Sequence, residues 1–374
     1  MSENENTPSN VTTEASPSPS AQAWGADLTL FICERCDWIF LASASSSNNN
    51  CPHCHQGVLS PLKDASEEEA THPELVIPFN LSSSVLESAI QSFSKEIPFA
   101  PDDLSYRQLH SRLQAIYLPM WLVDANVQAN WRSEVGFDYQ VVSHHEQFEQ
   151  NRGGWSTRQV NETKIRWEPR LGRLKRSYQN ISAPALEEHL QFRSQLGAFD
   201  LSQAGPYLAQ TTQNALVRLP NRSTQDAWSD AEPTFQAAAA EEVRQAAGAD
   251  HLRQFSWQAQ FQDQNWTLLL QPVFTTYYLD DANKPQPVLV HGQTGKTSGL
   301  RQASYKRAQR SSITLILTAG ILFMVSLLAW TFSILLPPIS TIGVLGMVAA
   351  LLVGFGSVIP LATVWWFNKN QTGK

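Results

Sequence analysis

Acidic residues are absent from the last 74 residues of this 374-residue chain, and two long runs there contain no charged residue at all. The runs cover residues 313–336 and about 342–367, and only Pro337-Pro338-Ile339-Ser340-Thr341 separates them. About 20 apolar residues in a helix cross a bilayer core roughly 30 Å thick. We therefore predict a transmembrane helical hairpin over residues 312–368. The lack of ionisable side chains inside it argues against an ion or substrate path.

The link between the two runs also lacks charge, whereas basic residues flank the pair on its other side. These residues are Arg301, Lys306, Arg307, Arg310, Lys369 and Lys374. Because positively charged flanks stay cytoplasmic, we expect both termini and the soluble part to face the cytoplasm from the cell inner (plasma) membrane. Gly346, Ala350 and Gly354 form a small-residue stripe, which we assign to packing within the hairpin rather than to an oligomer contact.

The N-terminus has almost no large apolar residues and lacks the basic start and apolar core of a secretory signal. Residues 1–26 are therefore expected to be disordered, and the soluble part to remain inside the cell. Residues 1–300 carry 21 basic and 34 acidic side chains, a net charge of −13. Such a balance disfavours general nucleic-acid binding, because phosphate backbones repel acidic surfaces.

Cysteine is rare, and its four positions have the spacing C-x2-C-x14-C-x2-C. The four are Cys33, Cys36, Cys51 and Cys54. Two such knuckles place four thiolates around one zinc ion, so we predict a zinc ribbon over residues 27–62 with a closed, structural site. His53 and His55 are then expected to be exposed rather than ligands.

Three other chemistries use cysteines in such a pattern. The run Cys51-Pro52-His53-Cys54-His55 matches the haem c attachment pattern, but that chemistry belongs outside the cytosol and would leave Cys33 and Cys36 unexplained. Disulfides are disfavoured by a reducing cytosol. Iron in a rubredoxin-like site uses similar ligands and stays open beside zinc.

Residues 73–300 are predicted to form an α+β domain with an antiparallel sheet, so the fold class is α+β throughout the soluble part. Strands are expected at 75–79, 117–131, 251–262, 267–279 and 287–291, and helices at 84–96, 184–196 and 232–247. Pro169-Arg170-Leu171-Gly172 predicts a hairpin turn. Residues 117–124 and 270–280 are faintly alike, as an internal duplication would make them.

A phosphate-binding motif is incomplete in this chain. Gly292-Gln-Thr-Gly295-Lys296-Thr297 resembles the end of a phosphate loop, but Val290 stands where the first glycine belongs and no helix is expected to follow. We predict a β-turn there. No catalytic or cofactor-binding residue is assigned, because no complete helicase or hydrolase set is present, and the chain is expected not to be an enzyme.

One stretch departs from the acidic balance of the soluble part. Residues 152–178 hold eight basic residues, two glutamates, two tryptophans and a tyrosine. Such a patch suits single-stranded nucleic acid or anionic lipid headgroups. A solvated hairpin with its charges paired is the simpler expectation.

Several segments resemble an uncharacterised bacterial family of zinc-ribbon membrane proteins. They are the two CxxC pairs, Ile77-Pro78-Phe79-Asn80, Phe99-Ala100-Pro101, Tyr117-Leu118-Pro119-Met120-Trp121 with Asp124, and Val290-His291-Gly292-Gln293-Thr294-Gly295. Members of that family are often labelled as similar to the primosomal replication-restart helicase or to TFIIB-type zinc ribbons. The resemblance implies an architecture and leaves the activity open.

These observations predict a membrane-anchored, non-enzymatic protein. Its zinc ribbon and cytosolic α+β domain are expected to act as a scaffold that binds a cytosolic protein partner. The alternative is a nucleic-acid-binding, replication-associated factor that uses the zinc ribbon and the basic stretch 152–178.

Overall fold

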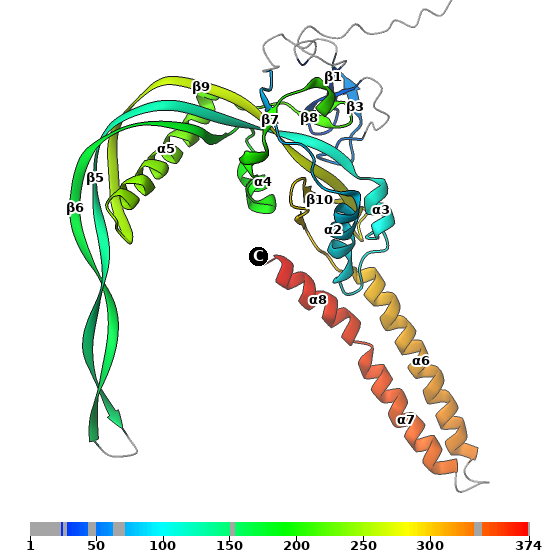
Figure 1. Cartoon of the computed structure of the whole chain (residues 1–374). Helices are drawn as coiled ribbons and strands as arrows, with labels where there is room; N and C mark the ends of the chain where they lie inside the picture. The colour runs from blue at the N-terminus through cyan, green and yellow to red at the C-terminus, as the bar shows by residue number, and fades with distance from the viewer. Residues whose placement is uncertain are drawn as a thin grey trace, which may run out of the picture.

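The computed structural model describes residues 24, 28–43, 50–62, 72–149, 154–332 and 339–372. It is a mixed α+β structure with one large sheet and a C-terminal pair of apolar helical segments (Figure 1). Of the tail predicted to be disordered, residues 1–23, 25 and 26 lie outside the described part. Trp24 is fully buried, and its ring packs edge-on against Tyr207 with centroids 5.8 Å apart.

Eleven described strands form the sheet. They are β1 (Leu28–Cys33), β2 (Ile39–Ser43), β3 (Leu59–Pro61), β4 (Leu75–Val76), β5 (Gln114–Glu149), β6 (Gly154–Pro184), β7 (Gly205–Pro206), β8 (Leu216–Arg218), β9 (His251–Leu279), β10 (Pro285–His291) and β11 (Thr297–Gly299). The main order is β11-β10-β9-β5-β8-β2-β1-β3. Because β2 pairs with β8, the cysteine-containing strands belong to the same sheet as the middle of the chain.

Helices cover this sheet and continue beyond it. They are α2 (Ser83–Lys95), α3 (Tyr106–Ser111), α4 (His189–Leu196), α5 (Thr224–Ala246), α6 (Tyr305–Phe332), α7 (Ile339–Gly356) and α8 (Ile359–Thr372), with 3₁₀ turns η2 (Leu201–Gln203) and η3 (Ala209–Thr212). The helix predicted to begin at Pro184 begins only at His189, since Pro184 still pairs with Met120 as the end of β6.

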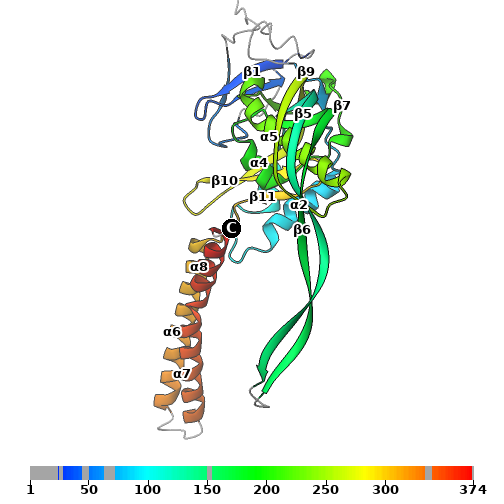
Figure 2. The same ribbon diagram turned by 90° about the vertical axis from the view of Figure 1, so that its left-hand side faces the viewer.

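The long strands β5, β6 and β9 leave the rest of the sheet together and form a curved arm (Figures 1 and 2). β5 pairs with β9 from Gln114↔Thr275 to Gly136↔His251. The two strands predicted at 251–262 and 267–279 are thus one strand, because a bulge opposite Asp124–Asn126 absorbs the polar residues between them. Beyond Gly136, residues 137–149 pair with 154–166 and with no other described strand, and we call this two-stranded part the ribbon.

The hairpin turn predicted at Pro169–Gly172 is wrong, because these residues lie inside β6 opposite Trp131–Glu134. β6 pairs with β5 alone among the described strands, and a proline without an N–H is tolerated on such an edge. Gly172 serves packing rather than turning: a Cβ there would come within 2.8 Å of the Trp131 ring. The chain reverses instead between Glu149 and Gly154, outside the described residues.

Two prolines mark where the central strands change neighbours. Pro119 lies where β5 changes its outer partner from β8 to β6, and Pro272 lies where β9 changes from β4 to β10. Each strand can lack an N–H there without breaking a continuous ladder. The faintly similar segments around these prolines pair antiparallel, Tyr117↔Pro272 and Pro119↔Leu270, so they are related by a local two-fold arrangement.

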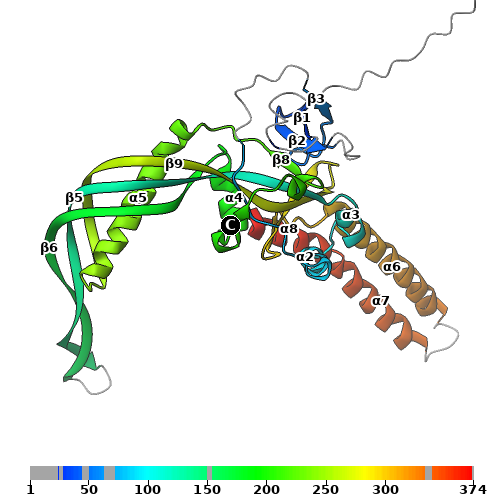
Figure 3. The ribbon, with the colours of Figure 1, turned by 45° about the horizontal axis from the view of Figure 1, so that its top comes forward.

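Helix α5 covers one face of the arm (Figure 3). Its buried residues recur every four positions: Ala227, Ala231, Phe235, Ala239 and Val243. They pack on the inward side chains of the arm, including Val127 and Trp121. The helix begins earlier than the predicted residue 232, because Ser223 caps it by accepting from the Asp226 N–H. Pro233 lies within it.

The start of α6 is hydrogen-bonded to the turn between β9 and β10. The Asp281 carboxylate accepts hydrogen bonds from Ser304 Oγ (2.5 Å) and the Lys306 N–H (3.0 Å). The Asn368 side chain near the end of α8 bonds both backbone groups of Ala303 (2.8 and 3.0 Å). These contacts join the start of α6 to the turn between β9 and β10 and the end of α8 to the segment that precedes α6, and we call them the clamp.

Two apolar segments, Tyr305–Phe332 and Thr341–Gln371, are long enough to cross a membrane and are only 17% buried over their most apolar windows. The predicted stripe packs within the pair: Gly346 lies against Ser326 Oγ, and Gly354 against Ala319. The second span is not one continuous helix. It breaks at Ser357–Val358, because Pro360 has no N–H to continue the helical ladder.

Candidate metal centre and adjoining cavity

The four predicted ligands come together at one end of the sheet. The sulfur atoms of Cys33, Cys36, Cys51 and Cys54 all lie within 4.8 Å of one another. The pairs Cys33–Cys54 and Cys36–Cys51 are each 3.6 Å apart. A tetrahedral zinc ion with Zn–S bonds of about 2.3 Å needs S···S edges of roughly 3.8 Å, so this donor set and its geometry fit one such ion.

The two knuckles have nearly the same backbone construction. In the first, the Cys33 N–H donates to Trp38 O (2.9 Å) and the Asp37 N–H donates to Cys33 O (3.0 Å). In the second, the Cys51 N–H donates to Gly57 O (2.9 Å) and the His55 N–H donates to Cys51 O (3.0 Å). Asp37 and His55 both have positive φ, 58° and 55°, so each knuckle closes on a left-handed residue.

Backbone amides also point at the sulfur atoms. The His53 N–H lies 3.4 Å from Cys51 Sγ, and the Gly57 N–H lies 3.3 Å from Cys54 Sγ. These donors stabilise thiolate charge. Burial raises the pKa of Cys36 to about 11 and raises that of Cys51 further, so these two sulfurs carry protons at neutral pH unless a cation displaces them.

Gly57 is a site residue that spacing alone does not identify. A Cβ at this position would collide with Cys33 Sγ and lie 3.0 Å from the Arg35 Cβ. The second knuckle can therefore approach the first only because residue 57 has no side chain. The signal for it in the sequence is a glycine three residues after the last cysteine.

The two histidines differ in environment. His53 is exposed, as predicted, and stacks on Trp38 with ring centroids 3.7 Å apart. His55 is 9% exposed, so the expectation that it is exposed is wrong. It stacks on Tyr277 (4.7 Å), and burial lowers its pKa to about 4. His55 thus joins the second knuckle to β9 as a neutral aromatic ring.

Arg218, on β8, is a second site residue that the sequence does not reveal. It is 5% exposed, its guanidinium carbon lies 4.5 Å from the centre of the Trp38 ring, and it donates to Ile39 O (3.0 Å). Burial lowers its pKa, while the nearby Glu188, Cys36 and Cys51 act in the opposite direction. A zinc ion held by four thiolates would carry a net charge of −2, which this buried cation would offset in part.

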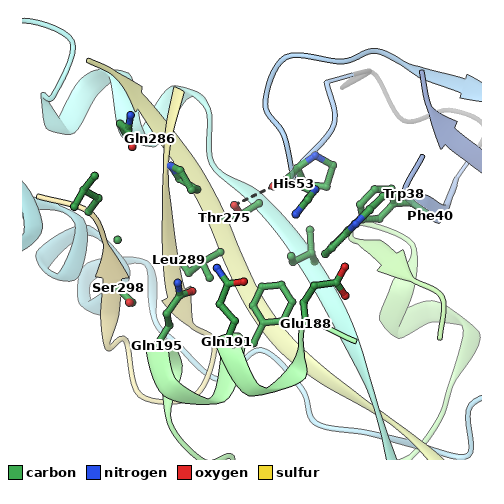
Figure 4. A pocket seen from close by; sticks show the side chains of 16 residues that line it. Trp38, Phe40, His53, Glu188, Gln191, Gln195, Thr275, Gln286, Leu289 and Ser298 are labelled. Atoms are coloured by element: carbon green, nitrogen blue, oxygen red, sulfur yellow. Dashed lines mark hydrogen bonds between the residues drawn. The ribbon is translucent and has the colours of Figure 1, made fainter. Parts of the chain in front are cut away.

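A cavity of about 460 Å³ lies between the cysteine module, α4 and the β10–β11 hairpin (Figure 4). Glu188, Gln191 and Gln195 project into it from α4 and its N-cap position. Thr275 and His53 lie on the far side, where Thr275 Oγ1 donates to Pro52 O (3.2 Å). The cavity floor is apolar and includes Phe40, Phe192 and Leu289.

The incomplete phosphate motif forms a tight turn, as predicted. The Gly295 N–H donates to His291 O (2.9 Å), and strand β11 follows rather than a helix. His291 is 1% exposed, stacks on Phe199 (3.9 Å) and accepts from the Gln293 N–H (3.1 Å). A Cβ on Gly292 would collide with Pro272 O. These residues therefore pack the turn against β9.

Residues 154–178 of the basic stretch lie in β6, where most of its described charges are paired. Arg166 and Arg170 both contact Glu168, and Arg176 contacts Glu242 on α5. Arg173 and Lys175 form no ion pair within the described ranges. They lie beside Gln128, Asn130, Gln258 and Gln260 in a shallow polar depression of about 620 Å³ on the arm.

Comparison with known proteins adds no relative to this description. No family model, curated protein or solved structure matches the chain. What the chain does is therefore inferred from its own residues and their arrangement.

Proposed function

We propose that the chain is a membrane-anchored, non-enzymatic scaffold whose zinc-ribbon module and α+β body hold a projecting arm for a protein partner. The ion is zinc, held by Cys33, Cys36, Cys51 and Cys54. Both termini and the soluble part lie on the cytoplasmic side of the cell inner membrane. The basic flank and the uncharged link of the apolar pair support this orientation.

The observation that carries this proposal is the arm itself. Among the described strands the ribbon pairs with no third strand, and its contacts with β9 are at its base, where Asp138 bonds to Asp250 and His251. An isolated two-stranded hairpin is marginally stable in water. Large apolar side chains point outward along the arm: Leu171 is 85% exposed, Val142 55% and Tyr139 47%. These side chains add little to the hydrophobic core of their own chain. We therefore assign them to contact with another protein.

The metal module supports the role of a scaffold. Four cysteines complete the ligand shell of a zinc ion and leave no position open for substrate, which is the pattern of structural rather than catalytic sites. Because β2 of this module pairs with β8, the ion stabilises the same sheet that carries the arm.

Photo-crosslinking in native membranes tests the proposal. The full chain carries photoreactive benzoylphenylalanine in place of Leu171 on the arm or, as a control, in place of Val58 near the cysteines, which is also apolar and is 49% exposed. We expect a discrete protein adduct from position 171 that is insensitive to nuclease, and none from position 58. Absence of a protein adduct from position 171 would contradict the proposal.

A second candidate function is nucleic-acid binding by the arm. The unpaired Arg173 and Lys175 among the amides of Gln128, Asn130, Gln258 and Gln260 are the observation that favours it. The same crosslinking separates the two functions. A nuclease-sensitive adduct at position 171, weakened by salt and by Arg173→Gln with Lys175→Gln, would replace the first proposal with the second.

A further inference from the structure

The cavity beside the cysteine module has features that the scaffold role leaves unexplained. Resting on that role, we propose that this cavity binds an extended segment of the partner protein that carries a lysine or arginine side chain. Its volume of about 460 Å³ lies within the range of ligand-binding cavities.

The charge of the cavity lining favours a positively charged occupant. Glu188 is the only Asp, Glu, Lys or Arg residue among those that line the cavity. Its Oε2 atom is buried without a hydrogen-bond partner in the described part of the chain. Arg218 is close enough to Glu188 to interact electrostatically, but the two form no ion pair within 4.0 Å among the described residues. Because Glu188 is the charged side chain that lines the cavity while Arg218 lies behind Trp38, an ammonium or guanidinium group would be attracted more strongly than a phosphate or carboxylate.

Two glutamine side chains that line the cavity are suited to hydrogen bonding with a peptide backbone. The side chains of Gln191 and Gln195 form no hydrogen bond within the described residues, and both line the cavity. Four residues of helix rise about 6 Å, and two residues of an extended chain advance about 6.7 Å. The two amides therefore lie near the spacing at which an extended peptide repeats its backbone N–H and C=O groups on one side.

The remaining walls suit the rest of such a segment. Ser298 of β11 lines the wall formed by the β10–β11 hairpin and, among the described residues, has no side-chain hydrogen bond. Phe40, Phe192 and Leu289 provide an apolar floor for a neutral side chain. The occupant is thus a short extended peptide with one basic side chain near Glu188 and uncharged neighbours.

A phage-displayed library of random hexapeptides, selected on the full chain in detergent micelles, tests this inference. We expect enriched sequences to hold one lysine or arginine among uncharged residues. The most enriched peptide, synthesised with a fluorescein label, is then titrated by fluorescence anisotropy. Glu188→Gln is expected to weaken binding at least tenfold, and Gln191→Ala with Gln195→Ala several-fold.

Glu187→Gln is the matched control, because it removes the neighbouring exposed carboxylate outside the cavity and is expected to leave affinity unchanged. Circular dichroism and metal content confirm that each variant is folded. Enrichment of acidic peptides, no enrichment, or unchanged binding by Glu188→Gln would overturn the inference, as would a co-purified lipid that only the unaltered cavity retains. If the position 171 adduct persists in those cases, the scaffold role stands and the cavity assignment alone fails.

Discussion

A single strand, β5, passes through three environments, and their differences show how the molecule is organised. From Ile116 to Val123 every side chain is buried, as expected for a strand covered on both faces. From Ala125 to Asn130 buried and exposed residues alternate strictly, because α5 covers one face only. In the ribbon, Asp138, Tyr139 and Gln140 are all exposed. β5 is therefore buried where it crosses the centre of the sheet and exposed to solvent where it forms the ribbon.

The largest expected effect comes from a substitution beside the four cysteines. Gly57→Ala should abolish metal binding, since its Cβ would displace Cys33 Sγ, and should destabilise the cysteine module by about 3 kcal/mol or more. Mass-spectrometric metal analysis of the purified full chain measures this, with hydrogen exchange reporting on β1 to β3. Gly57 is not in the left-handed region, so the test is purely steric.

Gly205→Ala is the control for this substitution, because a Cβ there meets no atom within 4 Å. It should keep about one metal ion per chain. Full metal occupancy in Gly57→Ala would show that the two knuckles can separate without losing the ion.

The next effect separates the arm from the body. Phe235 on α5 is fully buried, and its ring lies 5.4 Å from that of Phe261. Phe235→Ala should cost about 3–5 kcal/mol of local stability through the cavity it leaves. Hydrogen exchange should accelerate in the arm strands while β1 to β3 stay protected. Thr234→Ala, at the exposed neighbouring position, should change exchange little. Equal acceleration at both ends would mean that arm and body unfold as one unit.

The smallest effect tests the body by pH. Burial alone would raise the pKa of Asp103, but hydrogen bonds from Arg112 and the Leu279 N–H lower it below its ordinary value. A lowered pKa means that this carboxylate stabilises the folded state fully above about pH 4 and that the contribution is lost as pH falls through the folded value.

Asp103→Asn should therefore reduce the free energy of unfolding by about 1–2 kcal/mol at pH 7, and the difference from the unaltered chain should shrink toward pH 3. Denaturant titrations in detergent, followed by tryptophan fluorescence, measure both values. Glu232→Gln, on the exposed surface of α5, serves as the control. A constant difference at the two pH values would assign the loss to packing instead.

Local chemistry in the sequence predicted the cysteine cluster and the apolar pair, because spacing and run length are short-range signals. The small-residue stripe was also correctly assigned to packing within the pair, against Ser326 and Ala319. Turn residues misled at Pro169–Gly172, since a proline on an edge strand and a glycine under Trp131 look the same in sequence as a hairpin.

Other parts of the site depend on contacts between distant segments. Arg218 reaches Trp38 across 180 positions, and His55 is buried only because Tyr277 of β9 lies against it. Arg307 and Arg310, which served as signals of orientation, also contact Asp102 in the loop between α2 and α3. The hydrophobic periodicity of a sequence does not predict contacts between residues that are far apart along the chain. The length of β5 was likewise missed, because its far half is specified by partners rather than by its own alternation.

The clamp at Asp281 and Asn368 has a mechanical consequence. Since it joins the helical pair to the turn between β9 and β10 through several hydrogen bonds, a change in the inclination of the pair would act on β9, which continues into the arm. Helices answer a thinner or thicker bilayer by changing their inclination. In a chain anchored by this pair, such a change of inclination would displace the ribbon at the far end of the arm.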